Sequence, residues 1–309
     1  MKARFGKPRQ DPGEITPCVL RDWPLPVPAA GSDGGYRGRT LIVAGSAQMS
    51  GAAVLAALAA LRAGAGELCI ATARSVASMV ALAVPESRVI GLRETPRGGL
   101  ARLGTAPCAG DFEAILVGPG MQDDDATARL VQGLRARFPK ALLQLDGCAI
   151  TALENETVPW DRFAEGRVLI TPRPGELASL IGSSPDDVAA NAVRAVTRAA
   201  RQWRVTVLLK GVMSHVGTPE GHVWSHAGGG AVQATSGAGD VLSGIVAGLM
   251  ARGCTPEQAG VWGLALHAEA GEALVSRIGP VGFLARELSE QIPQLLCRFA
   301  DKAHRANDR

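Results

Sequence analysis

The sequence predicts an α/β fold with a central, mostly parallel β-sheet that is covered by helices on both faces. Short apolar runs recur along the chain and are apolar throughout rather than alternating, which is typical of strands buried on both faces. Segments with helical spacing of apolar residues lie between most of these runs. The composition agrees: 47% of the residues are hydrophobic, 38 are glycine and only 4% are aromatic, which suits a packed α/β protein with many tight turns.

The 309 residues divide into an irregular lead, one domain and a short tail. Residues 1–38 contain six prolines and a glycine-rich piece, so we expect irregular structure there, with one helical turn at 19–23. Residues 39–304 contain no linker-like run and are predicted to form a single domain. Residues 305–309 are expected to be a disordered tail.

The strands are expected to bring several motifs to one edge of the sheet. The first unit is a strand at 40–44, a turn at Gly45-Ser46 and an apolar helix at 52–62. Further strands are predicted at 67–71, 88–92, 113–117, 141–145, 167–170 and 205–209. Ligands of parallel sheets gather at the carboxyl ends of strands. The other motifs at such ends are Gly118-Pro119-Gly120, Asp146, Thr171 to Glu176, and Lys210-Gly211, which a second strand follows.

The most informative stretch is 228–253, where four small residues, Ser236 to Gly239, lead into Asp240 and a helical pattern of apolar residues. This pattern predicts a tight turn that feeds a helix N-terminus. Free amides and the positive end of the helix dipole can hold a phosphate there without a lysine. Asp240 in the first turn is a candidate base for a substrate hydroxyl. The alternative is a helix-capping aspartate.

The remaining candidates each have a functional and a structural interpretation. The glycines of 118–120 either admit a flat ligand or simply end a strand, and Asp146 is either a functional carboxylate or a helix cap. Arg173 either reaches a phosphate or is a solvated loop residue. Lys210 either meets a nucleotide or belongs to a hairpin turn. For His267, in the apolar helix 258–275, a satisfied core or helix-end histidine is favoured over a catalyst.

Several classes of protein are disfavoured. The formal net charge is +3 and the basic residues are scattered, so neither nucleic acid nor an anionic membrane is an expected partner. The six cysteines lie far apart, without a C-x-x-C pair or a histidine at metal-ligand spacing, so no metal site is predicted. No run approaches 18 apolar residues and no signal-peptide pattern is present, so we expect a cytoplasmic protein. A Walker A sequence and a full G-x-G-x-x-G are also lacking.

Taken in order, the motifs resemble the ADP- or ATP-dependent NAD(P)H-hydrate dehydratases, a branch of the ribokinase-like superfamily. The resemblance covers the chain from about Thr16 to the last predicted helix. It is carried by AGSAQMSGAAVLAALAALRAGAG (44–66), VGPGM, LQLDGCAI, TPRPGELASLIG, LLKG and ATSGAGDVLSGIVAGLMARG.

The resemblance implies a ribokinase-like fold and a metabolite-repair enzyme, a carbon–oxygen lyase. Such an enzyme phosphorylates the ring hydroxyl of hydrated NADH or NADPH (NADHX or NADPHX) with ADP or ATP and eliminates phosphate. The alternative is a hydroxyl kinase of the same superfamily, acting on a thiazole or pyrimidine alcohol or a sugar. A nucleotide-binding protein without catalysis is a third hypothesis, against which the intact GAGD sequence argues.

The resemblance also implies roles for individual residues. Asp240 would be the base, with Ser236, Gly237, Ala238 and Gly239 as the anion hole. The hydrated dinucleotide would meet Ala52, Gly120, Arg173 and Asp240. The nucleotide-binding residues would be Lys210, Gly211, Val212, Met213, Ser214 and Gly239. No metal ligand from the protein is implied, but Mg²⁺ is expected with the nucleotide. The family also implies a homo-oligomer, commonly a tetramer.

This sequence departs from the family pattern mainly on the substrate side. Arg173 stands where the family has histidine, Gln122 replaces the fifth residue of G-P-G-x-G, and Ser236 replaces a glycine. Asp146-Gly147-Cys148 stands for the usual D-A-D or D-A-N, and Gly230-Ala231-Val232 stands for Asn-Pro-Gly. The phosphate side is intact, so the sequence supports phosphoryl chemistry better than the identity of the acceptor.

Overall fold

The computed structural model describes residues 12–26, 38–101, 103, 111–154, 166–228 and 230–307. Within these residues lies one ten-stranded sheet in the order β1-β10-β9-β8-β7-β6-β5-β2-β3-β4. The strands are β1 (Gly13–Glu14), β2 (Arg39–Val43), β3 (Glu67–Ala73), β4 (Ser87–Leu92), β5 (Ala114–Val117), β6 (Leu142–Leu145), β7 (Val168–Ile170), β8 (Thr206–Leu209), β9 (Met213–Gly217) and β10 (Val223–Ala227). All strands from β8 across to β4 are parallel, whereas β9 is antiparallel to both of its neighbours.

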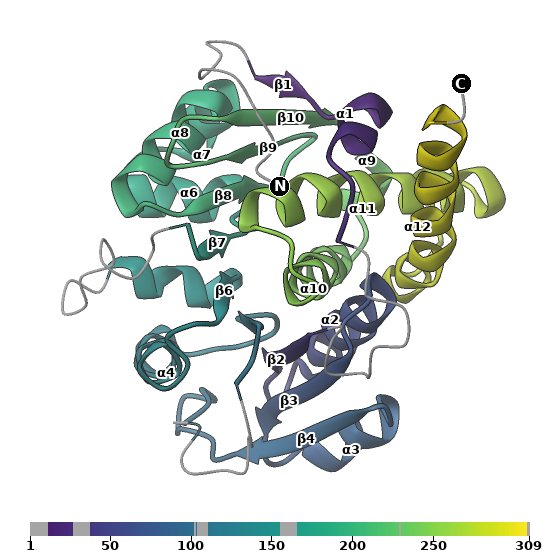
Figure 1. Cartoon of the computed structure of the whole chain (residues 1–309). Coiled ribbons are helices and arrows are strands. Elements are labelled where there is room, and N and C mark those ends of the chain that lie inside the picture. Colours follow the sequence, from purple (N-terminus) through teal and green to yellow (C-terminus); the bar gives the residue numbers. More distant parts are fainter. Residues whose placement is uncertain are drawn as a thin grey trace.

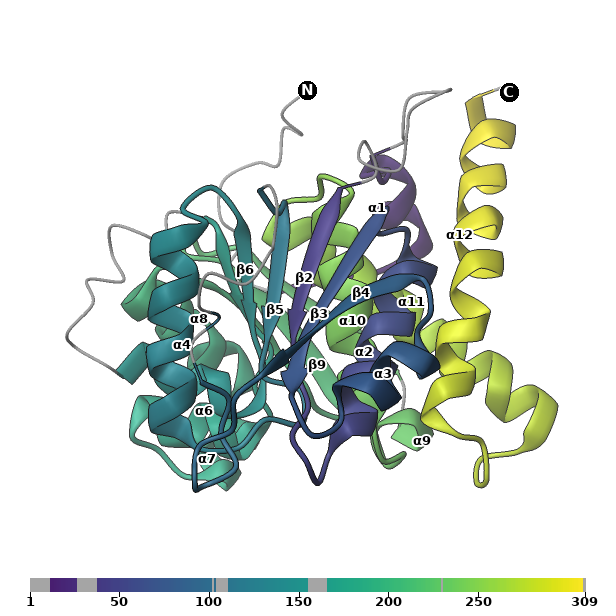
Figure 2. The same cartoon turned by 90° about the horizontal axis from the view of Figure 1, so that it is seen from below.

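Helices cover both faces of the sheet (Figures 1 and 2). On one face lie α4 (Asp124–Arg137), the 3₁₀ helix η2 (Gly147–Glu154), α6 (Pro174–Ile181), α7 (Pro185–Ala190) and α8 (Ala192–Trp203). On the other lie α2 (Ser50–Ala63), α3 (Ala77–Ala83), α10 (Ala238–Ala251) and α11 (Pro256–Ile278), with α1 (Pro17–Asp22) and α12 (Ala285–Asn307) packed outside them. The short α9 (Gly230–Gln233) precedes α10.

Burial on both faces explains why the strand sequences are apolar throughout. Leu41 and Val43 of β2 belong to one core cluster, and Ile42 between them belongs to the cluster on the opposite face. All three side chains are 0% exposed. The predicted strands begin within one residue and end within two residues of the observed ones. The α/β fold class is therefore confirmed.

The order of strands reverses between β2 and β5. From β2 the chain continues to β3 on one side, whereas β5 pairs with β2 on the other side. The amide of Gly45, after β2, donates to the carbonyl of Pro119, after β5, at 2.7 Å. A topological switch point of this kind is where open α/β sheets bind ligands, so Gly45 and 118–120 lie at the expected edge.

The helices α2 and α10 pack with their backbones in direct contact. A Cβ on Gly244 of α10 would lie 2.2 Å from the carbonyl oxygen of Ala56 in α2, and one on Gly248 would lie 2.4 Å from that of Ala60. The helices therefore run in the same direction at closest approach. Just before α10, a Cβ on Gly237 would lie 2.7 Å from Leu55 Cδ1, so α2 also lies close to the start of α10.

Two expected boundaries differ from the structure. Residues 12–26 of the lead contain β1, which pairs with β10, and α1, whose first turn is capped by the Thr16 side chain. The expected turn at 19–23 belongs to α1. Residues 1–11 and 27–37 of the lead lie outside the described residues. At the other end α12 continues to Asn307, past residue 304, because no glycine interrupts its last turns and basic residues suit a helix C-terminus.

Among the described residues, no helix is both long and apolar enough to span a bilayer.

Candidate active site

Three predicted motifs meet around one cavity of about 610 Å³ at the carboxyl ends of β7 and β8 and the N-terminus of α10. Its walls include Arg173 from the loop after β7, Lys210 from the loop after β8, and residues 234–239, which lead into α10 and form its first two positions. Gly211, Val212 and Ser214 also line it. Met213 instead lines a neighbouring cavity of about 870 Å³. Residues 210–214, the candidate nucleotide-binding segment, therefore lie between two cavities.

The turn before α10 leaves two amides for an anion. Gly237 is the N-cap and has a φ of 85°, in the left-handed region that favours glycine. The amide of Ala238 donates to the carbonyl of Thr235 at 3.1 Å, and that of Val241 donates to the carbonyl of Gly237 at 3.2 Å. The amides of Gly239 and Asp240 therefore remain available to an anion at the start of the helix. Ala238 was expected to bind the anion, but its amide stabilises the turn.

Gly239 faces two cations. A Cβ on Gly239 would lie 3.8 Å from Arg173 Nη2 and 3.8 Å from Lys210 Nζ. Free amides and two cationic groups around one small space suit a phosphate. The side chain of Lys210 is only 13% exposed, so it is not a solvated hairpin lysine, although β8 and β9 do form a hairpin. Arg173 is exposed at the N-cap of α6, and its amide donates to Glu176 Oε2 at 2.8 Å.

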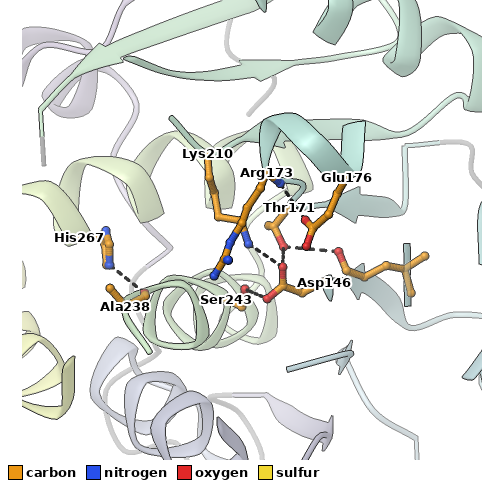
Figure 3. Close-up of polar contacts among 9 residues, drawn as sticks. Asp146, Thr171, Arg173, Glu176, Lys210, Ala238, Ser243 and His267 are labelled. Atoms are coloured by element: carbon orange, nitrogen blue, oxygen red, sulfur yellow. Dashed lines mark hydrogen bonds and ion pairs between the residues drawn. The ribbon is translucent and has the colours of Figure 1, made fainter. Parts of the chain in front are cut away.

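A buried carboxylate ties these segments together (Figure 3). Asp146 Oδ1 accepts hydrogen bonds from Lys210 Nζ at 2.7 Å and from Thr171 Oγ1 at 2.8 Å. Its Oδ2 accepts from Ser243 Oγ at 2.8 Å. Burial alone would raise the pKa of Asp146, but the Lys210 ammonium and the three hydrogen bonds hold it below its usual value. The side chain of Asp146 is therefore an ionised carboxylate that binds residues of three segments, and it does not act as a helix cap.

Asp240 is the third residue of α10, which excludes the N-cap interpretation. Burial raises its pKa to about 6, and the negative charge of Asp146 adds to this effect. Lys210 and Arg173 act in the opposite direction. A carboxylate with a pKa close to neutral is better suited to act as a general base than an ordinary aspartate.

His267 has a structural role beside the cavity. It is buried on α11, and its Nε2 lies 3.0 Å from the carbonyl oxygen of Ala238. Burial lowers its pKa to about 4, so the neutral ring donates from Nε2 to that carbonyl. The core interpretation of His267 is confirmed. Its hydrogen bond to the Ala238 carbonyl stabilises the turn that precedes Asp240.

The expected substrate residues form a second group. A Cβ on Gly120 would lie 2.6 Å from that of Ala52, so the two residues adjoin. Gln122, one of the departures, donates through Nε2 to Gln48 Oε1 at 3.1 Å. Neither Ala52 nor Gly120 lines the 610 Å³ cavity. Asp240 does not line this cavity either, but it directly follows Gly239, which does.

Sequence reasoning did not single out Ser243 and His226. Ser243 follows Asp240 by three residues, which places both on one helix face, and this spacing is the signal that could have found it. His226 lies at the end of β10, just before a glycine run, and lines the cavity.

Comparison with known proteins first defines the class. A ribokinase-like superfamily protein of Enterococcus faecalis V583 has the same fold, with a TM-score of 0.75, 23% identity and coverage of 96% of this chain and 99% of that chain. The class is therefore an α/β protein with a ribokinase-like fold.

The family follows from closer matches. The model of the NAD(P)H-hydrate dehydratase family matches residues 40–294. An ADP-dependent (S)-NAD(P)H-hydrate dehydratase of Xanthomonas campestris pv. campestris is 43% identical over 290 residues, 92% of this chain and 96% of the relative. The ADP/ATP-dependent NAD(P)H-hydrate dehydratase of Bacillus subtilis, co-crystallised with ATP and Mg²⁺, has a TM-score of 0.76 and 27% identity, covering 94% of this chain and 100% of that chain. The chain belongs to the NAD(P)H-hydrate dehydratase family. The predicted family and lyase class are confirmed, and the kinase alternative is not favoured.

Proposed function

We propose that this chain restores NADH and NADPH from their hydrates by phosphorylating the ring hydroxyl with ADP or ATP and then eliminating phosphate. The observation that carries the proposal is the position of Asp240. Its carboxylate, with a pKa of about 6, lies in the first turn of α10, next to Gly239, and is acted on by the charges of Lys210 and Arg173. The ADP-dependent activity in the name of the Xanthomonas relative supports this function.

The residues have separate tasks in this reaction. Asp240 accepts the hydroxyl proton while the hydroxyl oxygen bonds to the terminal phosphorus and the bond to the rest of the nucleotide breaks. The amides of Gly239 and Asp240, with Lys210, stabilise the charge on the transferring oxygens, because phosphoryl transfer depends on positioning and electrostatics. The new phosphate ester then loses phosphate and a ring proton, which restores the double bond of the reduced ring.

The segment 210–214 holds the nucleotide in this proposal, and Mg²⁺ would enter with its phosphates. Within the described residues, no group of three or more His, Cys, Asp or Glu could hold a metal by itself. Mg²⁺ usually takes one or two carboxylates together with substrate phosphates, so it is expected at this site only together with the nucleotide. Bound Mg²⁺ would neutralise phosphate charge.

We also propose a cytoplasmic homo-oligomer, a tetramer by family resemblance. Large apolar side chains exposed on α3, Met79 at 66% and Leu82 at 85%, are consistent with a covered face. Sedimentation of the purified protein measures this, and a monomer at micromolar concentration would contradict it.

The function is tested by incubating the protein with hydrated NADH or NADPH and either ADP or ATP. The absorbance of the reduced ring should return in at least one of the four mixtures. The kinase alternative predicts that no mixture recovers it and that nucleotide is consumed on another alcohol instead. That outcome, in protein shown to be folded and to bind nucleotide, would replace the dehydratase proposal.

As the pH is lowered, the activity should begin to fall at a higher pH than is usual for an enzyme whose general base is an aspartate. Asp240 works deprotonated, so kcat/KM is lost as the pH falls through its pKa of about 6. An unperturbed aspartate would place this limb near its ordinary pKa of 3.8. The pH profile of kcat/KM, measured where the protein stays folded, checks this, and a limb near pH 4 would contradict it.

Arg173→Ala should raise the apparent KM for the hydrate much more than it lowers kcat. A guanidinium suits a pyrophosphate or the 2′-phosphate of NADPHX, and loss of such uniform binding appears in KM. Steady-state kinetics with both hydrates measure it, with Arg198→Ala, an exposed arginine of α8, as the matched control. A kcat loss larger than the KM change would instead assign Arg173 to the transferring phosphoryl group.

A further inference from the structure

We propose that Asp146 is a positioning residue of this reaction, which holds the Lys210 ammonium beside the anion site and links it to the helix that carries Asp240. The inference rests on the proposed function, although its test does not need the repair reaction. Asp146 is buried at 4% exposure, and the sequence left open whether it is a functional carboxylate or a helix cap.

The geometry makes Asp146 a junction of three segments. Its hydrogen bonds reach Thr171 after β7, Lys210 after β8 and Ser243 in α10, at 2.8, 2.7 and 2.8 Å. A lysine has a long flexible stem with several rotatable bonds, so an ammonium at the end of a strand needs an anchor to stay in one place. The bond to Asp146 supplies this anchor, and it leaves Nζ 3.8 Å from a Cβ on Gly239. The positive charge is thus held where a phosphate would bind.

The same junction places a second carboxylate near Asp240. The charges that act on Asp240 are Asp146 at the end of β6, Lys210 after β8 and Arg173 at the start of α6. His267 of α11 is neutral beside Ala238. The α2 helix has no charged residue before Arg62, and the first turn of α12 carries Arg286 and Glu287. Since Asp146 raises and Lys210 lowers the pKa of Asp240, the pair adjusts the base in opposite directions.

Two measurements on Asp146→Asn, which keeps the shape and removes the charge, test the proposal. Reductive methylation followed by peptide mapping reads the position of Lys210 against the exposed Lys140 of the same molecule. Lys210 should react much more slowly than Lys140 in the wild type and several-fold faster in the variant. Carboxyl-carbon NMR, with the Asp240 signal assigned from its absence in Asp240→Asn, should show a lower pKa for Asp240, because the negative charge of Asp146 is gone.

Ser243→Ala is the matched control, because it removes one hydrogen bond to Asp146 but keeps the carboxylate and its contact with Lys210. Both readouts should stay at their wild-type values in this variant. If Asp146→Asn changes neither readout, or if Ser243→Ala changes both equally, Asp146 only supports packing and the proposal is overturned.

A second variant keeps the test decisive if Asp146→Asn does not fold. Lys210→Gln removes the cation and should raise the pKa of Asp240, which Lys210 lowers in the wild type. An unchanged Asp240 titration there would overturn the proposed coupling. All of these readouts are obtained without hydrate or nucleotide, so a failed repair assay and a failed role of Asp146 are separate results.

Discussion

Asp240→Asn is expected to slow turnover about 100-fold or more, the usual effect of losing a general base, while nucleotide affinity stays almost unchanged. Asparagine keeps the shape of the side chain but cannot accept the hydroxyl proton. The measurement is kcat for hydrate repair, together with calorimetric titration by ADP and ATP. Asp186→Asn, an exposed aspartate in the first turn of α7, is the matched control and should retain full activity.

The same variant should be more stable than the wild type at neutral pH. The folded-state pKa of Asp240, about 6, lies above the ordinary value of 3.8 for an aspartate, so this group favours the folded state when protonated and loses that contribution as the pH rises through 6. With allowance for partial solvation, removing the ionised carboxylate should stabilise the fold by about 2 kcal/mol at pH 7. Thermal unfolding at pH 7 and pH 4 should show a gain that shrinks at the lower pH. If Asp240→Asn kept near-normal turnover, Asp240 would be only a charge at the helix terminus and not the general base.

Gly239→Val should weaken the binding of both ADP and ATP by about tenfold or more, since each lost charge-assisted contact is worth roughly 1.5–3 kcal/mol. A Cβ at this position makes only ordinary contacts, 3.8 Å from Arg173 Nη2 and Lys210 Nζ, so the fold has room for it. The branched side chain would occupy the space between the cations and the amides, where the phosphate is expected. Calorimetric titration measures the loss.

Gly237→Ala separates this effect from damage to the turn. Gly237 has a φ of 85°, and its Cβ would lie 2.7 Å from Leu55 Cδ1. Alanine there should lower the melting temperature, whereas Gly239→Val should lower affinity with little change in melting. Unchanged affinity for both nucleotides in Gly239→Val would remove the anion site from this turn.

The features that could be predicted from the sequence are local. Strands buried on both faces are apolar throughout whatever their neighbours are, so their places are readable along the chain. The turn from Ser236 to Asp240 combines small residues, a carboxylate and a helical pattern within a few positions. Its structure as a helix N-terminus therefore follows from short-range rules.

The parts that could not be predicted depend on distant pairings. Ser243 and Asp146 are 97 residues apart, and Lys210 and Asp146 are 64 apart, so nothing within one segment shows that they meet. The choice between a functional Asp146 and a helix cap is made by three partners on other elements. Likewise β1 exists because Gly13 and Glu14 pair with Trp224 and Ser225 of β10, a partner that the proline-rich lead does not reveal.

The central claim is that phosphoryl transfer at Asp240 drives the repair of hydrated nicotinamide nucleotides. One measurement follows the recovered absorbance of the reduced ring and the released inorganic phosphate in the same sample, with hydrate and either ADP or ATP. The account predicts that one phosphate is released for each reduced ring regenerated, and that both products disappear together in Asp240→Asn. Phosphate release without ring recovery, or ring recovery without nucleotide, would contradict it.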